Sequence, residues 1–344
     1  RQSRMLYMSN SLQQLQELGQ SVWFDDIRRG LIESGALQEL IDLGVTGLTS
    51  NPTIFEKAVS GSTDYDDALL RLADAGLDAT RIYEKLTVED IQGAADLLKP
   101  IYDRTGGSDG YASLEVNPHL ANDTATTITE ARRLFTELAR PNVMIKVPGT
   151  PAGFPAIRKL IGDGINVNVT LLFSLDAYRQ SREAYIAGLE DLTASGGDVK
   201  SVASVASFFI SRVDTVVDTQ LNERITAGAI ALETLLGRAA VANAKLAYRD
   251  FQDTFRGSRF AQIKAEGARV QRTLWGSTSV KNPAYRDVMY VDDLIGKDTV
   301  NTMPESTLRA FLDHGVPTQT LESHVEQADH ILEELDTAGI SMTE

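Results

Sequence analysis

The stretch NVMIKVPGTPAGFPAI, residues 142–157, shows the unit from which this chain is built. Val143 to Val147 form a short run that predicts a buried β-strand, and Lys146 is its single polar residue. Pro148 and Gly149 follow at once and indicate that the strand ends in a loop. Barrel enzymes hold their reactive groups in loops at the carboxyl ends of their strands. The stretch therefore favours a barrel strand that ends at a functional lysine.

Short apolar or β-branched runs alternate with long helical patterns along the whole chain, with no low-complexity linker between them. The predicted strands are Val22–Asp25, Val45–Ser50, Ala112–Val116, Val143–Val147, Ile165–Leu171, Val202–Phe209, Arg272–Gly276 and Thr299–Met303. Eight parallel strands close a barrel. We therefore expect an α/β fold, a single (β/α)8 TIM barrel domain with extra helices, over residues 10–344. Residues 1–9, where Arg1 to Arg4 precede Met5, are expected to be disordered or to originate from cloning.

Helical spacing of apolar residues predicts the segments between the strands. One helix follows the possible cap Asp78 and runs to Ile101, and another spans Ala125 to Ala139 after Asn122 and Asp123. A long helical region is predicted from Asp214 to Phe255, and a terminal one from Thr318 to Leu335.

The composition narrows the class of protein. A chain of 344 residues with 42% hydrophobic content can fill a large core, and the absence of cysteine excludes a disulfide framework and a thiolate nucleophile. Without a signal-like or membrane-spanning run, we expect a cytoplasmic protein with no membrane partner. The net charge of −15, without a basic stripe, argues against nucleic acid. An anionic substrate would therefore need a local cationic pocket. Nothing in the sequence predicts the oligomeric state.

Lys146 is the first candidate for the chemistry. Burial between Ile145 and Val147 favours the neutral amine, which can attack a carbonyl carbon to form a Schiff base. The alternative is a lysine that protects an edge strand or points to a solvated rim.

The stretch GVTGLTSNPTIFEKA places Thr49, Ser50 and Asn51 at the end of another short strand. Their polar side chains suit a sugar site. The alternative is an ordinary strand-to-helix turn, in which Asn51 caps a helix that begins at Pro52.

Two carboxylates close apolar strands in the same way, Asp25 after VWF and Glu115 in YASLEVNP. Aldol cleavage needs a base for a hydroxyl proton, and Schiff-base formation needs a proton shuttle, so the two could divide these tasks. Either could instead be a salt-bridge partner or a helix cap. Asp26 lies beside Asp25, and the pattern does not choose between them.

In GINVNVTLLFS the alternation places Asn168 and Thr170 on one face of a strand, which suggests substrate contact. Later segments supply candidates for an anion pocket: Ser207, Phe209, Arg212, Ser279 and Lys281. Arg212 and Lys281 could equally be plain surface charges. The motifs GxxxxGK, GxGxxG and HExxH are absent, and the four histidines form no ligand set. We therefore expect no metal site and no cofactor.

GLTSNPTIF (Gly47 to Phe55) and VMIKVPGTPAG (Val143 to Gly153) resemble the two signature motifs of transaldolases, in the same order and spacing. NVNVTLLFS, FFISRVD, LWGSTSVKNP and TVNTMPE resemble further blocks of that family, and the likeness runs from Ser21 to Met303. It is greatest to the longer bacterial members. The resemblance implies a (β/α)8 barrel and a cofactor-free transferase of the pentose phosphate pathway. This enzyme would move a dihydroxyacetone unit from sedoheptulose 7-phosphate to glyceraldehyde 3-phosphate.

The resemblance also implies residue roles. Lys146 matches the Schiff-base lysine, Asp25 the acid/base at the C4 hydroxyl, and Glu115, with Thr170 and a water, the relay for carbinolamine dehydration. Asn51, Asn168, Ser207, Thr49 and Phe209 match residues that contact the sugar. Arg212, Ser279 and Lys281 match residues that contact the phosphate. Other branches of the family carry Arg in place of Lys281.

Two rival functions remain. A fructose 6-phosphate aldolase would use the same fold and lysine but release the three-carbon unit, and the resemblance implies a tyrosine there in place of Glu115. A catalytically silent sugar-phosphate-binding protein would bind the substrate without covalent capture.

Overall fold

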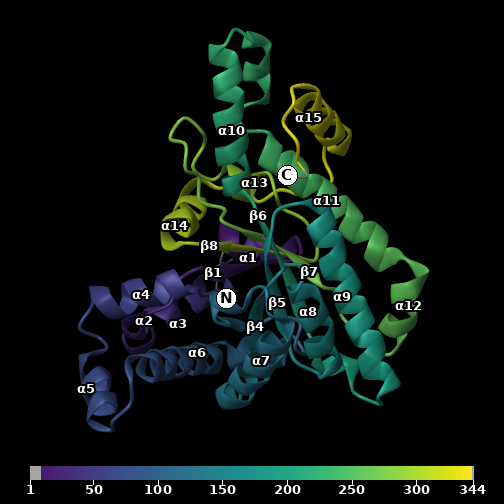
Figure 1. Ribbon diagram of the computed structural model, residues 1–344. Coiled ribbons are helices and arrows are strands. Elements are labelled where there is room, and N and C mark those ends of the chain that lie inside the picture. The colour runs from purple at the N-terminus through teal and green to yellow at the C-terminus, as the bar shows by residue number, and fades with distance from the viewer. Residues whose placement is uncertain (1–8, 343–344) are drawn as a thin grey trace, which may run out of the picture.

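Eight parallel strands form a closed barrel in sequential order, β1 to β8, in a computed structural model that describes residues 9–342 (Figure 1). The strands are β1 Gln20–Phe24, β2 Val45–Leu48, β3 Ala112–Glu115, β4 Val143–Pro148, β5 Val167–Leu172, β6 Ser204–Phe209, β7 Arg272–Gly276 and β8 Thr299–Met303. All eight predicted strands are confirmed, with each end within two residues of the prediction. The predicted TIM barrel is therefore correct. The segment predicted to precede the domain lies outside the described residues up to residue 8.

Helices surround the strands, and α5 and the outer part of α10 extend away from the barrel (Figure 1). The helices of the first half are α1 Ser11–Glu17, α2 Arg29–Glu33, α3 Ala36–Leu43, α4 Pro52–Gly61, α5 Asp66–Asp74, α6 Ala79–Arg104, α7 Thr124–Leu138 and α8 Gly153–Gly162. Those of the second half are α9 Leu175–Ala194, α10 Ser211–Thr226, α11 Ala239–Arg256, α12 Ser258–Ala265, α13 Met289–Asp292, α14 Glu305–His314 and α15 Val325–Thr337. Short 3-10 turns are η1 Pro118–Leu120, η2 Val199–Ser201 and η3 Ile230–Leu235. No helix within residues 9–342 is both long enough and apolar enough to cross a bilayer.

The predicted caps of two helices are confirmed. The Asp78 side chain accepts the backbone N–H of Arg81 at the start of α6, and Asp123 accepts that of Thr126 at the start of α7. Each cap satisfies a backbone donor that the first helical turn leaves without a partner.

Two helical predictions need correction. The region from Asp214 to Phe255 is not continuous, because α10 and α11 are separated by η3 and by left-handed turns at Gly228 and Gly237. The predicted terminal helix begins later, at Val325, after His324 with a left-handed φ of 58°. Upstream, Thr320 exchanges hydrogen bonds with Ile295 in an irregular segment: its backbone N–H donates to the Ile295 carbonyl at 2.9 Å, and its hydroxyl accepts the Ile295 N–H at 3.0 Å. These tertiary bonds compete with helical ones.

The middle of the barrel is filled by a layer of apolar side chains, separate from the larger core between strands and helices. Its buried members are Trp23, Tyr111, Met144, Ala203, Val205, Leu274 and Val300. The Trp23 ring lies so close to β2 that a Cβ added at Gly47 would meet its Nε1 at 2.4 Å. Glycine is therefore required at residue 47 for this layer to close. Polar residues follow the layer at the carboxyl end of most strands, among them Lys146, Ser207 and Thr302, whereas β7 has Gly276 there.

Candidate active site

Lys146 lies at the carboxyl half of β4, with 7% of the residue exposed. Its Nζ donates to the Ser50 carbonyl at 2.7 Å and lies 3.2 Å from Glu115 Oε2. Parallel pairing of β3 and β4 sets Glu115 directly beside Lys146. A buried amine with a carboxylate in contact has a proton acceptor at hand, which is the arrangement that a carbonyl-attacking lysine needs. The alternative of a lysine on a solvated rim is therefore wrong.

Asn168 lies beside Lys146 on β5 and is fixed through both ends of its amide. Its Nδ2 donates to Ser113 Oγ at 3.2 Å, and its Oδ1 accepts from Ser207 Oγ at 2.7 Å. Thr170, two residues further along the strand, is buried and lines a cavity together with Lys146. The predicted polar face of β5 is thus inside the barrel, and not on an outer edge.

Two threonines from neighbouring strands form a chain of hydrogen bonds that ends at Asp25. Thr49 Oγ1 donates to Asp25 Oδ1 at 2.7 Å, and Thr49 Oγ1 and Thr302 Oγ1 lie 2.6 Å apart. A hydroxyl has one proton, so Thr302 donates to Thr49 when Thr49 donates to Asp25. Asp26 is placed differently: its carboxylate accepts the Ile27 N–H at 2.8 Å, and burial raises its pKa. Asp25, and not Asp26, therefore lines the cavity.

Asn51 caps α4, as the alternative interpretation predicted. Its Oδ1 accepts the Ile54 N–H at 2.9 Å, and Pro52 occupies the first turn. Asn51 also lines the cavity that contains Lys146. The cap uses one lone pair of Oδ1, so the amide nitrogen and the second lone pair of Oδ1 are left for a ligand.

The outer part of the cavity carries two exposed cations. Arg212, on the first turn of α10, lies over the Phe209 ring with 5.1 Å between guanidinium carbon and ring centroid. Lys281 donates a short hydrogen bond to Ser279 Oγ. Within residues 9–342, neither Arg212 nor Lys281 forms an ion pair with a carboxylate. Both charges are therefore free to bind an anion.

These residues enclose a cavity of about 280 Å³ at the carboxyl end of the barrel. Its lining contains Asp25, Thr49, Asn51, Lys146, Thr170, Ser207, Phe209, Leu274, Arg212, Gly276, Ser277, Ser279, Lys281, Thr302 and Pro304. Glu115 and Asn168 of the predicted set do not line it, but contact Lys146 and Ser207 that do. Because Glu115 balances Lys146, the cations Arg212 and Lys281 against the single carboxylate Asp25 give the cavity the local positive charge that an acidic protein needs to bind an anionic substrate.

The transaldolase/fructose-6-phosphate aldolase family model matches residues 22–344. A relative from Thiobacillus denitrificans named transaldolase is 48% identical over 97% of this chain and 92% of its own length. Relatives named transaldolase 2, from a Nostoc species, and transaldolase 1, from Streptomyces avermitilis, are 46% and 47% identical. They cover 97% and 99% of this chain, and 89% and 90% of their own lengths.

This chain belongs to the transaldolase/fructose-6-phosphate aldolase family. The resemblance seen in the sequence motifs is confirmed, and the family places the protein among the sugar-phosphate enzymes. The buried lysine and the cationic rim are the features expected of an enzyme that binds a phosphorylated ketose covalently.

Several lining residues of this family member were not predicted as site residues. Thr302 lies in TVNTMPE, a block that resembled the family, and its position two residues after the barrel-filling Val300 was the signal that could have found it. Ser277 has a left-handed φ of 55° and shares a hydrogen bond of 2.9 Å with Ser211. That contact joins the start of α10 to the loop after β7, and neither segment alone predicts it.

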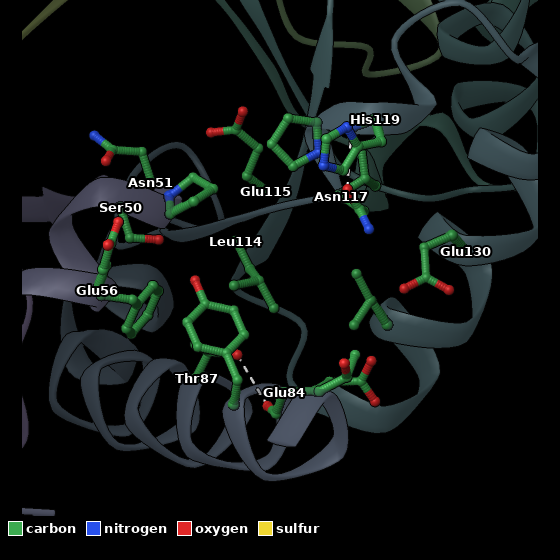
Figure 2. A pocket seen from close by; sticks show the side chains of 17 residues that line it. Ser50, Asn51, Glu56, Glu84, Thr87, Leu114, Glu115, Asn117, His119 and Glu130 are labelled. Carbon is green, nitrogen blue, oxygen red and sulfur yellow. Dashed lines mark hydrogen bonds between the residues drawn. The ribbon is translucent and has the colours of Figure 1, made fainter. Parts of the chain in front are cut away.

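A second hollow of about 490 Å³ adjoins the cavity on the side of Glu115 (Figure 2). Glu115 lies at its edge between Asn51 and Asn117, and Glu84 and Thr87 of α6 lie on the opposite wall (Figure 2). Asn51 lines both spaces. Glu115 therefore has access to solvent from a side other than the substrate cavity.

Proposed function

We propose that this protein is a transaldolase that works through a Schiff base on Lys146. It would transfer a dihydroxyacetone unit from sedoheptulose 7-phosphate to glyceraldehyde 3-phosphate, giving erythrose 4-phosphate and fructose 6-phosphate. The observation that carries the proposal is the buried Lys146 amine, 3.2 Å from Glu115, in a cavity with a cationic rim. The relatives named transaldolase support the transferase class.

In the first step, the Lys146 amine attacks the C2 carbonyl carbon of the ketose, and the oxygen leaves as water to give an iminium. This exchange needs proton transfers to and from the carbinolamine. Glu115, with the Thr170 hydroxyl and a water, is assigned to them because its carboxylate contacts the amine. The hollow beside Glu115 is the route by which that water can enter and leave.

In the second step, Asp25 accepts the proton of the C4 hydroxyl. The C3–C4 bond breaks, its electron pair moves into the iminium, and the aldose leaves. The remaining enamine adds to the aldehyde carbon of the acceptor, whose oxygen takes the proton back from Asp25, and water then hydrolyses the new iminium. The Thr49 hydrogen bond orients Asp25 for both transfers.

The other lining residues hold the substrate. Asn51, Asn168 and Ser207 are assigned to the hydroxyls of the three-carbon unit, and Thr49 and Phe209 to the pocket wall. Arg212, Ser279 and Lys281 are assigned to the phosphate, because the two cations have no carboxylate partner among the described residues. We further propose that residues 10–344 act as one barrel domain, in the cytoplasm.

Borohydride trapping tests the proposal. The chain is incubated with fructose 6-phosphate and sodium borohydride, digested, and mapped by mass spectrometry. A reduced three-carbon or six-carbon adduct on Lys146 is expected, and Lys146→Arg should give none. The proposal fails if the wild-type chain forms no adduct at Lys146.

A second candidate is fructose 6-phosphate aldolase activity, since the family includes both enzymes. The carboxylate Glu115, in place of a phenol beside Lys146, favours transfer. Fructose 6-phosphate without an acceptor should therefore release little free dihydroxyacetone, as measured with glycerol dehydrogenase. Steady multiple-turnover release would identify the aldolase instead.

A further inference from the structure

A third cavity lies at the amino-terminal end of the barrel, on the opposite side of the apolar layer from Lys146. Its volume is about 320 Å³. It is lined by residues at the beginnings of several strands, in the loops before them and at the end of α12: Ser108, Tyr111, Met144, Ala203, Ser204, Val205, Lys264, Ala268, Arg269, Val270, Arg272, Lys297 and Asp298. We call it the lower pocket. Its inner wall is apolar, because Tyr111, Met144 and Val205 belong to the layer that fills the barrel.

The rim of the lower pocket is basic. Lys264 and Lys297 are exposed, and within residues 9–342 neither forms an ion pair with a carboxylate. Arg269 donates to the backbone carbonyls of Gly106 and Lys200, which hold the guanidinium without neutralising it. These positive charges stand in a chain of net charge −15. A local excess of positive charge that opposes the field of the whole protein indicates an anion-binding surface.

The fourth cation, Arg272, is held in place from within the barrel. It donates to Ser21 Oγ at 2.7 Å and lies 3.5 Å from Asp109 Oδ1. Ser21 and Trp23 also donate to Asp109, at 2.5 and 2.9 Å. Asp109 thus balances Arg272, and Asp298 is the one carboxylate that lines the lower pocket. The three positive charges of Lys264, Arg269 and Lys297 outnumber the one negative charge of Asp298.

We propose that the lower pocket binds a small phosphorylated metabolite with an apolar or aromatic body, of the size of a nucleoside monophosphate. Its phosphate contacts Lys264, Lys297 and Arg269, and its body lies against Tyr111, Met144 and Val205. A cavity of this volume is within the range of small-molecule sites, which are mostly apolar with a few placed polar groups. The site is independent of the chemistry assigned to Lys146, from which the filled barrel layer separates it.

Calorimetric titration of the full chain with AMP tests this site. Saturable binding is expected, and the double variant Lys264→Gln/Lys297→Gln should weaken it by about tenfold or more, since it removes two charges that contact the phosphate. We call the cavity that contains Lys146 the upper cavity. Lys281→Gln, which removes a cation from the upper cavity, serves as the matched control and should leave AMP binding unchanged. Adenosine and inorganic phosphate, titrated separately, should each bind more weakly than AMP.

Each other outcome contradicts the proposal. Loss of AMP binding in Lys281→Gln alone would place the nucleotide in the upper cavity. Equal binding of AMP and adenosine would remove the role of the basic rim, and equal binding of phosphate would remove that of the apolar wall. Absence of any AMP binding overturns the site outright. If the double variant melts at a lower temperature than the wild type, the two single variants replace it, because each changes one exposed side chain.

Discussion

Lys146 Nζ and Glu115 Oε2 lie 3.2 Å apart because the register of β3 and β4 sets these two residues side by side. The contact links the amine that would attack the substrate to a carboxylate that also borders a second hollow. Substitutions around this pair separate the proton-transfer role of Glu115 from its structural role.

Glu115→Gln keeps the size of the side chain but removes the proton acceptor. We expect kcat to fall by about 10²–10⁴, the usual range for a general acid/base. Borohydride trapping on Lys146, followed over time, should slow in parallel, because the defect lies in Schiff-base formation. Glu56→Gln, which changes another carboxylate lining the hollow in Figure 2, is the control and should retain wild-type trapping. Normal trapping in Glu115→Gln would remove Glu115 from the relay.

Thr302→Val should lower kcat by roughly three- to tenfold while leaving KM nearly unchanged. The hydroxyl of Thr302 supports Thr49, which donates to Asp25, so its loss disturbs the orientation of the base at a cost of about one hydrogen bond. Thr302→Ser should restore activity, because it restores the donor. Steady-state kinetics of the three proteins decide the matter, and a change confined to KM would show that Thr302 acts on substrate binding instead.

Lys281→Arg should lower KM for fructose 6-phosphate, and Lys281→Gln should raise it, each by a fewfold to about tenfold. A guanidinium can bind a phosphate through two parallel hydrogen bonds, whereas an ammonium acts as a point charge and a glutamine carries none. The comparison substrate is fructose, the same ketose without the phosphate, which should be used equally well by all three proteins. Equal effects on both substrates would argue that residue 281 acts through loop structure.

The stability of the protein should depend on Asp214. This buried carboxylate on α10 accepts the Tyr290 hydroxyl at 2.6 Å and the Ala240 N–H at 2.7 Å, and burial raises its pKa to about 6. Because the folded state binds the proton more tightly than the unfolded state, this group favours folding below about pH 4. That contribution is lost as the pH rises to about 6, and amounts to roughly 3 kcal/mol.

Urea unfolding between pH 4 and pH 7 measures this dependence. In Asp214→Asn the corresponding decrease should disappear, so the difference in unfolding free energy between wild type and variant should change by up to that amount across the interval. Asp42→Asn, at an exposed residue, controls for the loss of one charge. Parallel curves for wild type and Asp214→Asn would contradict the assignment.

Gly47→Ala should destabilise the barrel by about 1–3 kcal/mol, because the added methyl group would overlap the Trp23 ring. Gly61→Ala is a matched control at the end of α4, where a Cβ meets nothing within 4 Å, and it should be neutral or stabilising by up to about 1 kcal/mol. Denaturant melts of both variants make the comparison. Equal stability of the two would mean that Trp23 moves aside at little cost.

The barrel could be predicted from the sequence because each strand carries its own signal, an apolar run bounded by turn residues. The same holds for Lys146, a polar residue within such a run, and for the caps at Asp78 and Asp123. The late start of α15 could not be predicted, because the bonds between Thr320 and Ile295 join segments far apart in the chain. Helix propensity reflects neighbouring residues in the chain and does not predict such tertiary contacts.

The candidate site, too, could be predicted from the sequence only where the signal was local. Strand position identified Asp25 only together with Asp26, and the threonines that contact Asp25 decided between them. For Asn51, the cap and the cavity-lining position proved compatible, because one amide has two polar ends. The basic rim of the lower pocket had no sequence signal, since Lys264 lies on α12 and Arg269 and Lys297 lie in two separate loops.

Within the described residues, the apolar layer around Trp23 closes the upper cavity on its amino-terminal side, so a sugar enters and leaves at the carboxyl end of the barrel. An aldose released from C4 must leave by the opening through which the ketose arrived, and an acceptor cannot enter until it has gone. Donor and acceptor therefore compete for the same opening, and a high concentration of either should inhibit binding of the other. The order in which substrates bind and products leave therefore follows from the filled barrel as much as from the reactive groups.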